Sequence, residues 1–268
     1  MPAINPARLK IRCTEIGEYF SDPQQFVAKL HDLLNFYADR IRRPGEAGAP
    51  PPLLPAYHVP APVLRHLERE ITPRAAQYPQ AALSLADALW DEKWLEPRLL
   101  AAAILGNIPP ALPDPILERV QTWGVGCKEA LLQKELFTRG VSQIREHHQE
   151  EFLRVIGDLM ANSKKDAQRG GLYALIPLLE DENFQNLPVV YHMLSTMLKR
   201  EETGLQSEIV AIVSALSKRS EQETVFFLQE TLLTAADPRI TRVVRRSLSF
   251  FSEENQKRLR EKLRKKRL

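Results

Sequence analysis

The sequence predicts an all-α protein in which short helices stack in pairs. Apolar residues recur at i, i+3 and i+4 along nearly all of the 268-residue chain, and strand-like alternation is almost absent. About a dozen such segments follow one another with short connections. Each pair would leave an apolar face that only the next pair can cover, which is the packing of an α-solenoid, or α-α superhelix. A compact, irregular helical domain is the alternative.

Cap residues followed by proline indicate where the helices begin. Proline at the first helical position presets φ and gives up no helical hydrogen bond. Such pairs occur at Asn5-Pro6, Asp22-Pro23, Thr72-Pro73, Asp114-Pro115 and Asp237-Pro238. Ser220 to Glu223 has the pattern of a capping box before an apolar helix that reaches Leu233.

Composition divides the chain into four expected parts. Residues 1–43 form an N-terminal helical arm, and residues 44–60, rich in proline and glycine, form a surface loop. Residues 61–252 form the helical repeat body, and residues 253–268 form a basic C-terminal helix. The apolar face of the arm would carry Phe26, Val27, Leu30, Leu34, Tyr37 and Ile41.

Positive charge is concentrated at the C-terminal end. The formal net charge is +3, but residues 257–268 alone carry +7, which leaves −4 for the rest of the chain. A basic segment of this kind can follow a phosphate backbone. It can equally be a solvated helix end whose cations complement the helix dipole, and both interpretations stay open.

Several function classes lack support in the sequence. Cys13 and Cys127 are the only cysteines, the start of the chain has no apolar leader, and no apolar run approaches a membrane span, so we expect a cytoplasmic protein. The adjacent His147 and His148 would point about 100° apart on a helix, and no second ligand pair accompanies them. Glycine-rich phosphate loops are missing. We therefore predict no cofactor and no metal, and we expect a monomer.

The stretch Ala82–Leu105 carries a family resemblance. It has two apolar-striped helices joined at Trp94, with Glu96-Pro97-Arg98 opening the second. This junction resembles the second helical pair of HEAT-like DNA alkylation repair proteins of the AlkD type. The segment Tyr57–Arg65 resembles the extended piece that leads into an arginine-bearing helix in that family. The resemblance implies degenerate HEAT-like or armadillo-type helical repeats and double-stranded DNA as the partner.

The same resemblance points to Trp123 and Cys127. Trp123 matches a family tryptophan that packs on a deoxyribose near the lesion, and catalytic members have an aspartate four residues later, where this chain has Cys127. A fixed carboxylate stabilises the positive charge that develops on the sugar, whereas a thiol at pH 7 is mostly neutral. The catalytic residues are therefore unassigned, and excision of N-alkylated purines is left open. If this segment were helical, Glu129 would point away from Cys127.

Arginines supply the other predicted DNA-binding residues. Asn162–Leu172 resembles the start of a helix whose arginine touches DNA, which selects Arg169, although Gly170 and Gly171 depart from the pattern. Arg242, Arg245 and Arg246, with Arg239 a turn earlier, share a face of one helix. They would form either a phosphate-binding ridge or a solvated face paired with acids such as Glu253.

Two functions from different classes remain. The first is a DNA-binding protein that resembles alkylation repair glycosylases, either active or catalytically degenerate. The second is a non-enzymatic helical-repeat scaffold that binds a protein or peptide partner in its groove. Trp90 fits packing better than lesion contact, because a tryptophan at helical spacing more often lies in a core, while Trp123 fits both.

Overall fold

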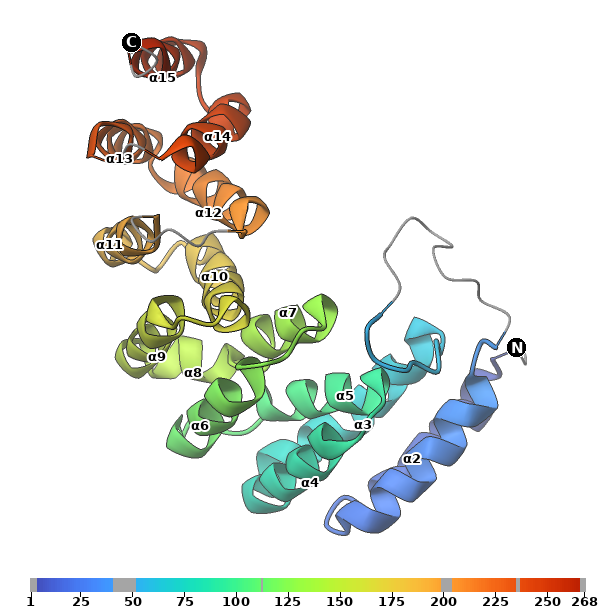
Figure 1. Cartoon of the computed structure of the whole chain (residues 1–268). Helices are drawn as coiled ribbons and strands as arrows, with labels where there is room; N and C mark the ends of the chain where they lie inside the picture. The colour runs from blue at the N-terminus through green and yellow to red at the C-terminus, as the bar shows by residue number, and fades with distance from the viewer. Residues whose placement is uncertain (1–3, 41–51, 112, 199–203, 235–236, 266–268) are drawn as a thin grey trace. The chain divides into compact units, whose positions relative to one another are not determined.

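The computed structural model describes residues 4–40, 52–111, 113–198, 204–234 and 237–265, which form helices and no strand (Figure 1). This confirms the predicted all-α class, and the helical packing is compatible with an α-α superhelix. The chain divides into two compact units, Met1–Phe152 and Leu153–Leu268. Within the described residues, no helix is long and apolar enough to cross a membrane.

The first unit has two layers of helices. Its helices are α1 Pro6–Gly17, α2 Pro23–Tyr37, α3 Ala61–Gln77, α4 Pro79–Asp91, α5 Leu95–Leu105, α6 Pro113–Gly124, α7 Ala130–Thr138 and α8 Ser142–His147. One layer runs α1, α3, α5, α7, each packed on the next, and α2 packs on α4 in the other layer. The α5 helix is buried almost throughout, because its Leu- and Ala-rich sequence meets neighbours on every side.

The second unit repeats the same arrangement. Its helices are α10 Lys165–Glu180, α11 Leu187–Leu198, α12 Gln206–Arg219, α13 Glu221–Thr234, α14 Pro238–Ser247, the short 3-10 helix η1 Leu248–Phe250 and α15 Glu253–Lys265, while α9 Gln149–Ala161 spans the boundary between units. The α12 helix packs on both α10 and α14, and α13 packs on α15. The α14 helix, which carries Arg242, Arg245 and Arg246, and the basic α15 helix therefore belong to different layers of this unit.

Three of the proline-marked starts are confirmed. Asn5, Asp22 and Asp237 each cap a helix, and their side chains accept hydrogen bonds from backbone N–H groups two or three residues after the cap. The capping-box helix begins at Glu221, directly after Ser220.

Two other starts were placed wrongly. Pro73 lies inside α3, because the buried stripe that ends in Ile71 and Ala75 continues through it, and the next helix begins at Pro79. Pro115 lies in the first turn of α6, which begins at Pro113, and a proline is tolerated there.

The arm packs on the helices that follow it. Phe26, Leu30, Leu34 and Tyr37 are buried as expected, together with Leu33, whereas Val27 is half-buried and Ile41 lies outside the described residues. The α1 helix contacts α3, and α2 contacts α4. The first helical pair thus shares a core with the pairs after it.

Candidate nucleic-acid interface

Two buried carboxylates hold residues 52–60 on the first unit as a non-helical strap. Glu96 is only 4% exposed, and its oxygens accept hydrogen bonds from the backbone N–H groups of Tyr57 at 3.0 Å and His58 at 2.7 Å. Glu129 accepts one from Leu53 N at 2.6 Å. His58 has φ of 54°, a left-handed conformation that is unfavourable for a non-glycine residue. Glu96, at the predicted helix start, therefore stabilises a strained turn.

Tyr57 fastens this strap to the arm. Its ring stacks on Trp94 with centroids 4.2 Å apart, and its hydroxyl lies 2.8 Å from Nδ1 of His31 on α2. The other ring nitrogen of His31 lies 3.1 Å from the carboxylate of Glu92. Burial raises the pKa of Tyr57, and Glu96 and Glu92 raise it further, so the hydroxyl stays protonated at neutral pH.

Trp90 and Trp123 stack on each other in the first unit. Their ring centroids are 4.4 Å apart and their planes differ by 6°, and both side chains are half-buried. The Asp87–Arg119 ion pair, at 2.6 Å, joins the same two helices one turn earlier. The stack therefore helps to join α4 to α6, which supports the packing interpretation for Trp90 and gives one face of Trp123 a structural contact.

The chain leaves the helix directly after Trp123. Gly124 closes α6 against the ring of Phe137, where an added Cβ would collide, so this glycine serves packing. Gly126 has φ of 97° in open space, a conformation that favours glycine. Cys127 then lies in a loop, and its thiol donates to the carbonyl oxygen of Glu129 at 3.7 Å. Because residues 125–129 are not helical, the prediction that Glu129 points away from Cys127, which assumed a helix, does not apply here.

The carboxylates near Trp123 in sequence have other environments. Asp114 and Glu118 are exposed on α6. Glu129 is 8% exposed, and one of its oxygens is engaged by the strap at Leu53. Among the described residues, no group of three or more His, Cys, Asp or Glu side chains is arranged to hold a metal ion.

Arg169 lies in the second unit within an ion-pair cluster. Its guanidinium donates to Glu208 of α12 at 3.0 Å and to Asp166 at 3.3 Å, and its side chain is 18% exposed. Burial alone would raise the pKa of Glu208, but hydrogen bonds from Ser207, a backbone N–H and Arg169 lower it overall. Arg169 therefore joins α10 to α12, and a DNA contact would have to compete with these carboxylates.

The predicted arginine ridge has a different environment. Arg242, Arg245 and Arg246 are all exposed, on the side of α14 opposite its buried residues. Those buried residues are Ile240, Val243, Val244 and Ser247. Across the described part of the chain, no carboxylate forms an ion pair with any of the three arginines, Glu253 included. Arg239 differs from them, because it pairs with the cap residue Asp237 at 2.7 Å.

The basic C-terminal helix is docked on the second unit. Leu259 and Leu263 of α15 are buried, while Lys257, Arg258, Arg260 and Arg264 are exposed. Arg258 pairs with Glu254 at 2.5 Å. Residues 266–268, which contribute to the predicted tail charge, lie outside the described residues.

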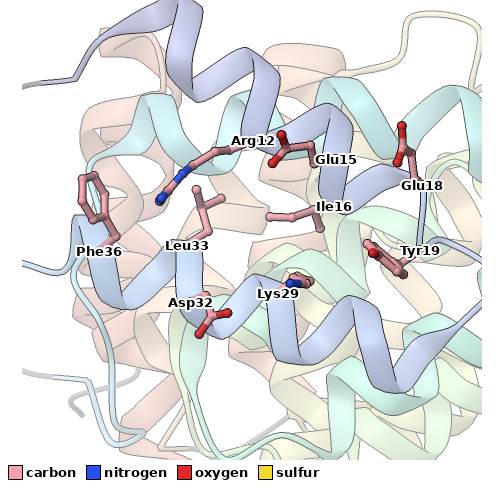
Figure 2. Close-up of a pocket in the computed structure, with 9 residues that line it drawn as sticks. All are labelled: Arg12, Glu15, Ile16, Glu18, Tyr19, Lys29, Asp32, Leu33 and Phe36. Carbon is pink, nitrogen blue, oxygen red and sulfur yellow. The ribbon is translucent and has the colours of Figure 1, made fainter.

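A groove between α1 and α2 is a further candidate site (Figure 2). Its volume is about 490 Å³, and Figure 2 shows Ile16 and Leu33 between the two helices. The guanidinium of Arg12 lies over the Phe36 ring at 4.7 Å. Charged residues of both signs line it, namely Arg12, Lys29, Glu15, Glu18 and Asp32. Such a mixed rim does not favour a polyanion.

Comparison with protein families shows which family this chain belongs to. The family model described as DNA alkylation repair enzyme matches residues 53–247, most of the chain. The chain belongs to this family. Searches of curated proteins and of solved structures found no significant match.

The family match begins at Leu53, in the strap, and ends at Ser247, the last residue of α14. The whole arm, residues 1–43, and all of α15 lie outside it. The predicted DNA alkylation repair residues fall into two groups, Trp123 with Cys127 in the first unit, and Arg169 with the ridge in the second. Within the second unit, α10 and α14 both pack on α12, so Arg169 and the ridge occur in one layer.

The sequence did not predict that Glu96 and Glu129 hold the strap by accepting hydrogen bonds from its backbone N–H groups. The only local signal was a glutamate at each helix start, which ordinary dipole effects explain equally well.

Proposed function

We propose that this DNA alkylation repair family member binds duplex DNA that carries N-alkylated purines, and that the α14 ridge contacts the phosphate backbone. The observation that carries the proposal is the set of exposed arginines, Arg242, Arg245 and Arg246, which form no ion pair with any described carboxylate. Guanidinium groups match phosphate geometry and are weakly hydrated, so they exchange water for phosphate readily. A solvated face neutralised by acidic neighbours would have left them paired.

Arg169 has a secondary role in this proposal. Its charge is already balanced by ion pairs with Asp166 and Glu208, so a phosphate would gain less from it than from a ridge arginine. Its main contribution is to fix α10 against α12, the helix on which α14 packs.

In the first unit, we propose that Trp123 contacts the lesion nucleotide. The side chain is only half-buried, and its stacking on Trp90 fixes the ring before DNA binds, which lowers the entropy lost on contact. The glycine-containing loop that follows leaves open space at Gly126. Both features favour a ligand approaching next to the ring.

Excision is the step that this chain is poorly equipped to perform. A thiol, Cys127, stands where the resemblance expects the carboxylate, and Glu129 is engaged by the strap. Without a carboxylate aimed at the sugar, the developing positive charge loses its main electrostatic stabilisation. We therefore propose that the protein recognises alkylated duplex without accelerating base release beyond the rate of the duplex alone, and a single-turnover measurement of released base tests this.

Salt dependence tests DNA binding against the scaffold alternative. Binding of a fluorescent duplex, with and without methylated purines, would be followed by anisotropy between about 50 and 300 mM salt. Phosphate contacts predict affinity that falls steeply with salt. No binding to either duplex at the lowest salt would reject this function and favour a protein partner.

A further inference from the structure

The second unit has an apolar groove between α11 and α13. Its volume is about 530 Å³. The apolar lining comes from Pro188, Tyr191, Phe226 and Phe227, and Glu223 and Glu230 lie at the rim. The groove is thus made by aromatic side chains and bordered by carboxylates.

Fixed aromatic rings make the floor of the groove. The rings of Tyr191 and Phe227 lie 5.1 Å apart, and the Tyr191 hydroxyl is 2.9 Å from Oγ1 of the fully buried Thr224. Thr224 in turn donates to the Ser220 carbonyl at 2.7 Å. These contacts restrain Tyr191, so the groove is formed before any ligand binds, which favours affinity.

The α13 helix continues this surface beyond the groove. Phe226 is 65% exposed and Leu233 is 62% exposed, and they stand seven residues apart, two helical turns along one face. Glu223 and Glu230 have the same spacing, about 60° further round the helix. An apolar line therefore runs beside an acidic line. Large side chains exposed in such a line, bordered by charge, are typical of interaction sites.

We propose that this groove binds a short amphipathic segment of a partner protein, with apolar anchors on one face and lysine or arginine beside them. The anchors would cover Phe226 and Leu233, and the cations would meet Glu223 and Glu230. The seven lining residues suit a short segment, since a stable interface between two copies needs about 800 Å² from each. The carboxylates repel phosphate, which disfavours nucleic acid.

The groove and the arginine ridge use different helices of the unit. The ridge lies on α14, and α14 packs on α12 in the layer that starts with α10. The groove lies on α11 and α13, and its lining residues include none of the predicted DNA-binding residues. Binding at the groove therefore does not depend on the proposed DNA contact.

Two synthetic helical probes would test the proposal on the full-length protein. Both carry leucine and phenylalanine at i, i+4 and i+7, and the flanking residues are lysine in one and glutamate in the other. Fluorescence anisotropy should show the basic probe binding at least about tenfold more tightly, because opposite charges lie along the groove. Glu223→Gln with Glu230→Gln should reduce that preference to less than about threefold.

Phe226→Ala gives the second arm of the experiment. Loss of the exposed anchor should weaken the basic probe about tenfold or more, whereas the control Ile11→Ala, at a side chain 60% exposed on α1, should leave it unchanged. Duplex binding should be the same in all these variants. Circular dichroism verifies that each is folded.

Three results would overturn the proposal. They are equal binding of both probes, unchanged affinity after Phe226→Ala, and a concentration-dependent dimer in sedimentation that Phe226→Ala abolishes. The last result would assign the groove to a second copy of this chain.

Discussion

Removing the charge of the α14 ridge should reduce the salt dependence of duplex binding. Each phosphate that a cation neutralises contributes about −0.9 to the slope of log affinity against log salt. Three arginines, Arg242, Arg245 and Arg246, therefore supply up to about 2.7 of that slope. Over a fourfold rise in salt, from about 50 to about 200 mM, this amounts to a loss of about 40-fold in affinity that the triple glutamine variant should not show.

The assay is anisotropy of a labelled duplex across this salt range, with the wild type and R242Q/R245Q/R246Q in parallel. The three side chains are exposed on the face opposite the buried residues of α14, so each change should alter stability by no more than about 0.5 kcal/mol. A matched control, R8Q/K10Q/R12Q on α1, removes the same charge from outside the family match. The control should keep the wild-type slope.

Equal slopes for the ridge variant and the wild type would refute the reasoning, because the arginines would then release no counterions. An equal decrease in the α1 control would refute it differently, by showing that net charge matters and position does not.

Four further substitutions probe the other residues that the sequence singled out. Arg169→Gln should lower the free energy of unfolding by about 1–3 kcal/mol at pH 7. The pKa of Glu208 lies below its ordinary value, so its ion pair stabilises the fold above the ordinary glutamate pKa and is lost as pH falls. The difference between wild type and Arg169→Gln in urea unfolding should therefore shrink in acid. A difference that stays constant with pH would contradict this. Trp123→Ala should abolish the preference for alkylated over unmodified duplex in competition binding. Trp90→Ala should lower the melting temperature and reduce the preference less, because the Trp123 ring is still present but no longer held by stacking; equal effects on preference would make the stack purely structural. Cys127→Asp should raise methylated purine release at least about tenfold in single turnovers, and an unchanged rate in a folded variant would mean that this loop cannot aim a carboxylate at the sugar.

Local chemistry explains which parts of the fold the sequence could predict. Asn5, Asp22 and Asp237 each act within the turn that follows them, so their caps were correctly predicted. Pro73 was misread as a start, because burial of Ile71 and Ala75 against neighbouring helices outweighs the missing hydrogen bond. Such burial depends on segments distant in the sequence.

In the candidate site, too, local features could be predicted from the sequence, whereas contacts between distant residues could not. That Arg242, Arg245 and Arg246 share an exposed face of α14 was predictable, because their spacing along the helix is local. The role of Arg169 was not, since its partner Glu208 lies 39 residues away on α12. Glu96 and Tyr57 are also 39 residues apart, and the Glu96 carboxylate holds the strap by accepting a hydrogen bond from the Tyr57 backbone N–H. A backbone donor of this kind leaves no side-chain pattern in the sequence from which the contact could be predicted. The apolar groove combines two helices, neither of which shows a groove alone.

One measurement tests the central proposal most directly. Protein in excess over a duplex carrying N-methylated purines is followed in a single turnover, with complex formation by anisotropy and released base by chromatography in the same mixture. We expect a complex in low salt and base release no faster than from the duplex alone, because Cys127 stands where the resemblance expects the carboxylate. Release well above the rate without protein would contradict the proposed loss of chemistry, and absence of a complex would contradict the proposed DNA contact.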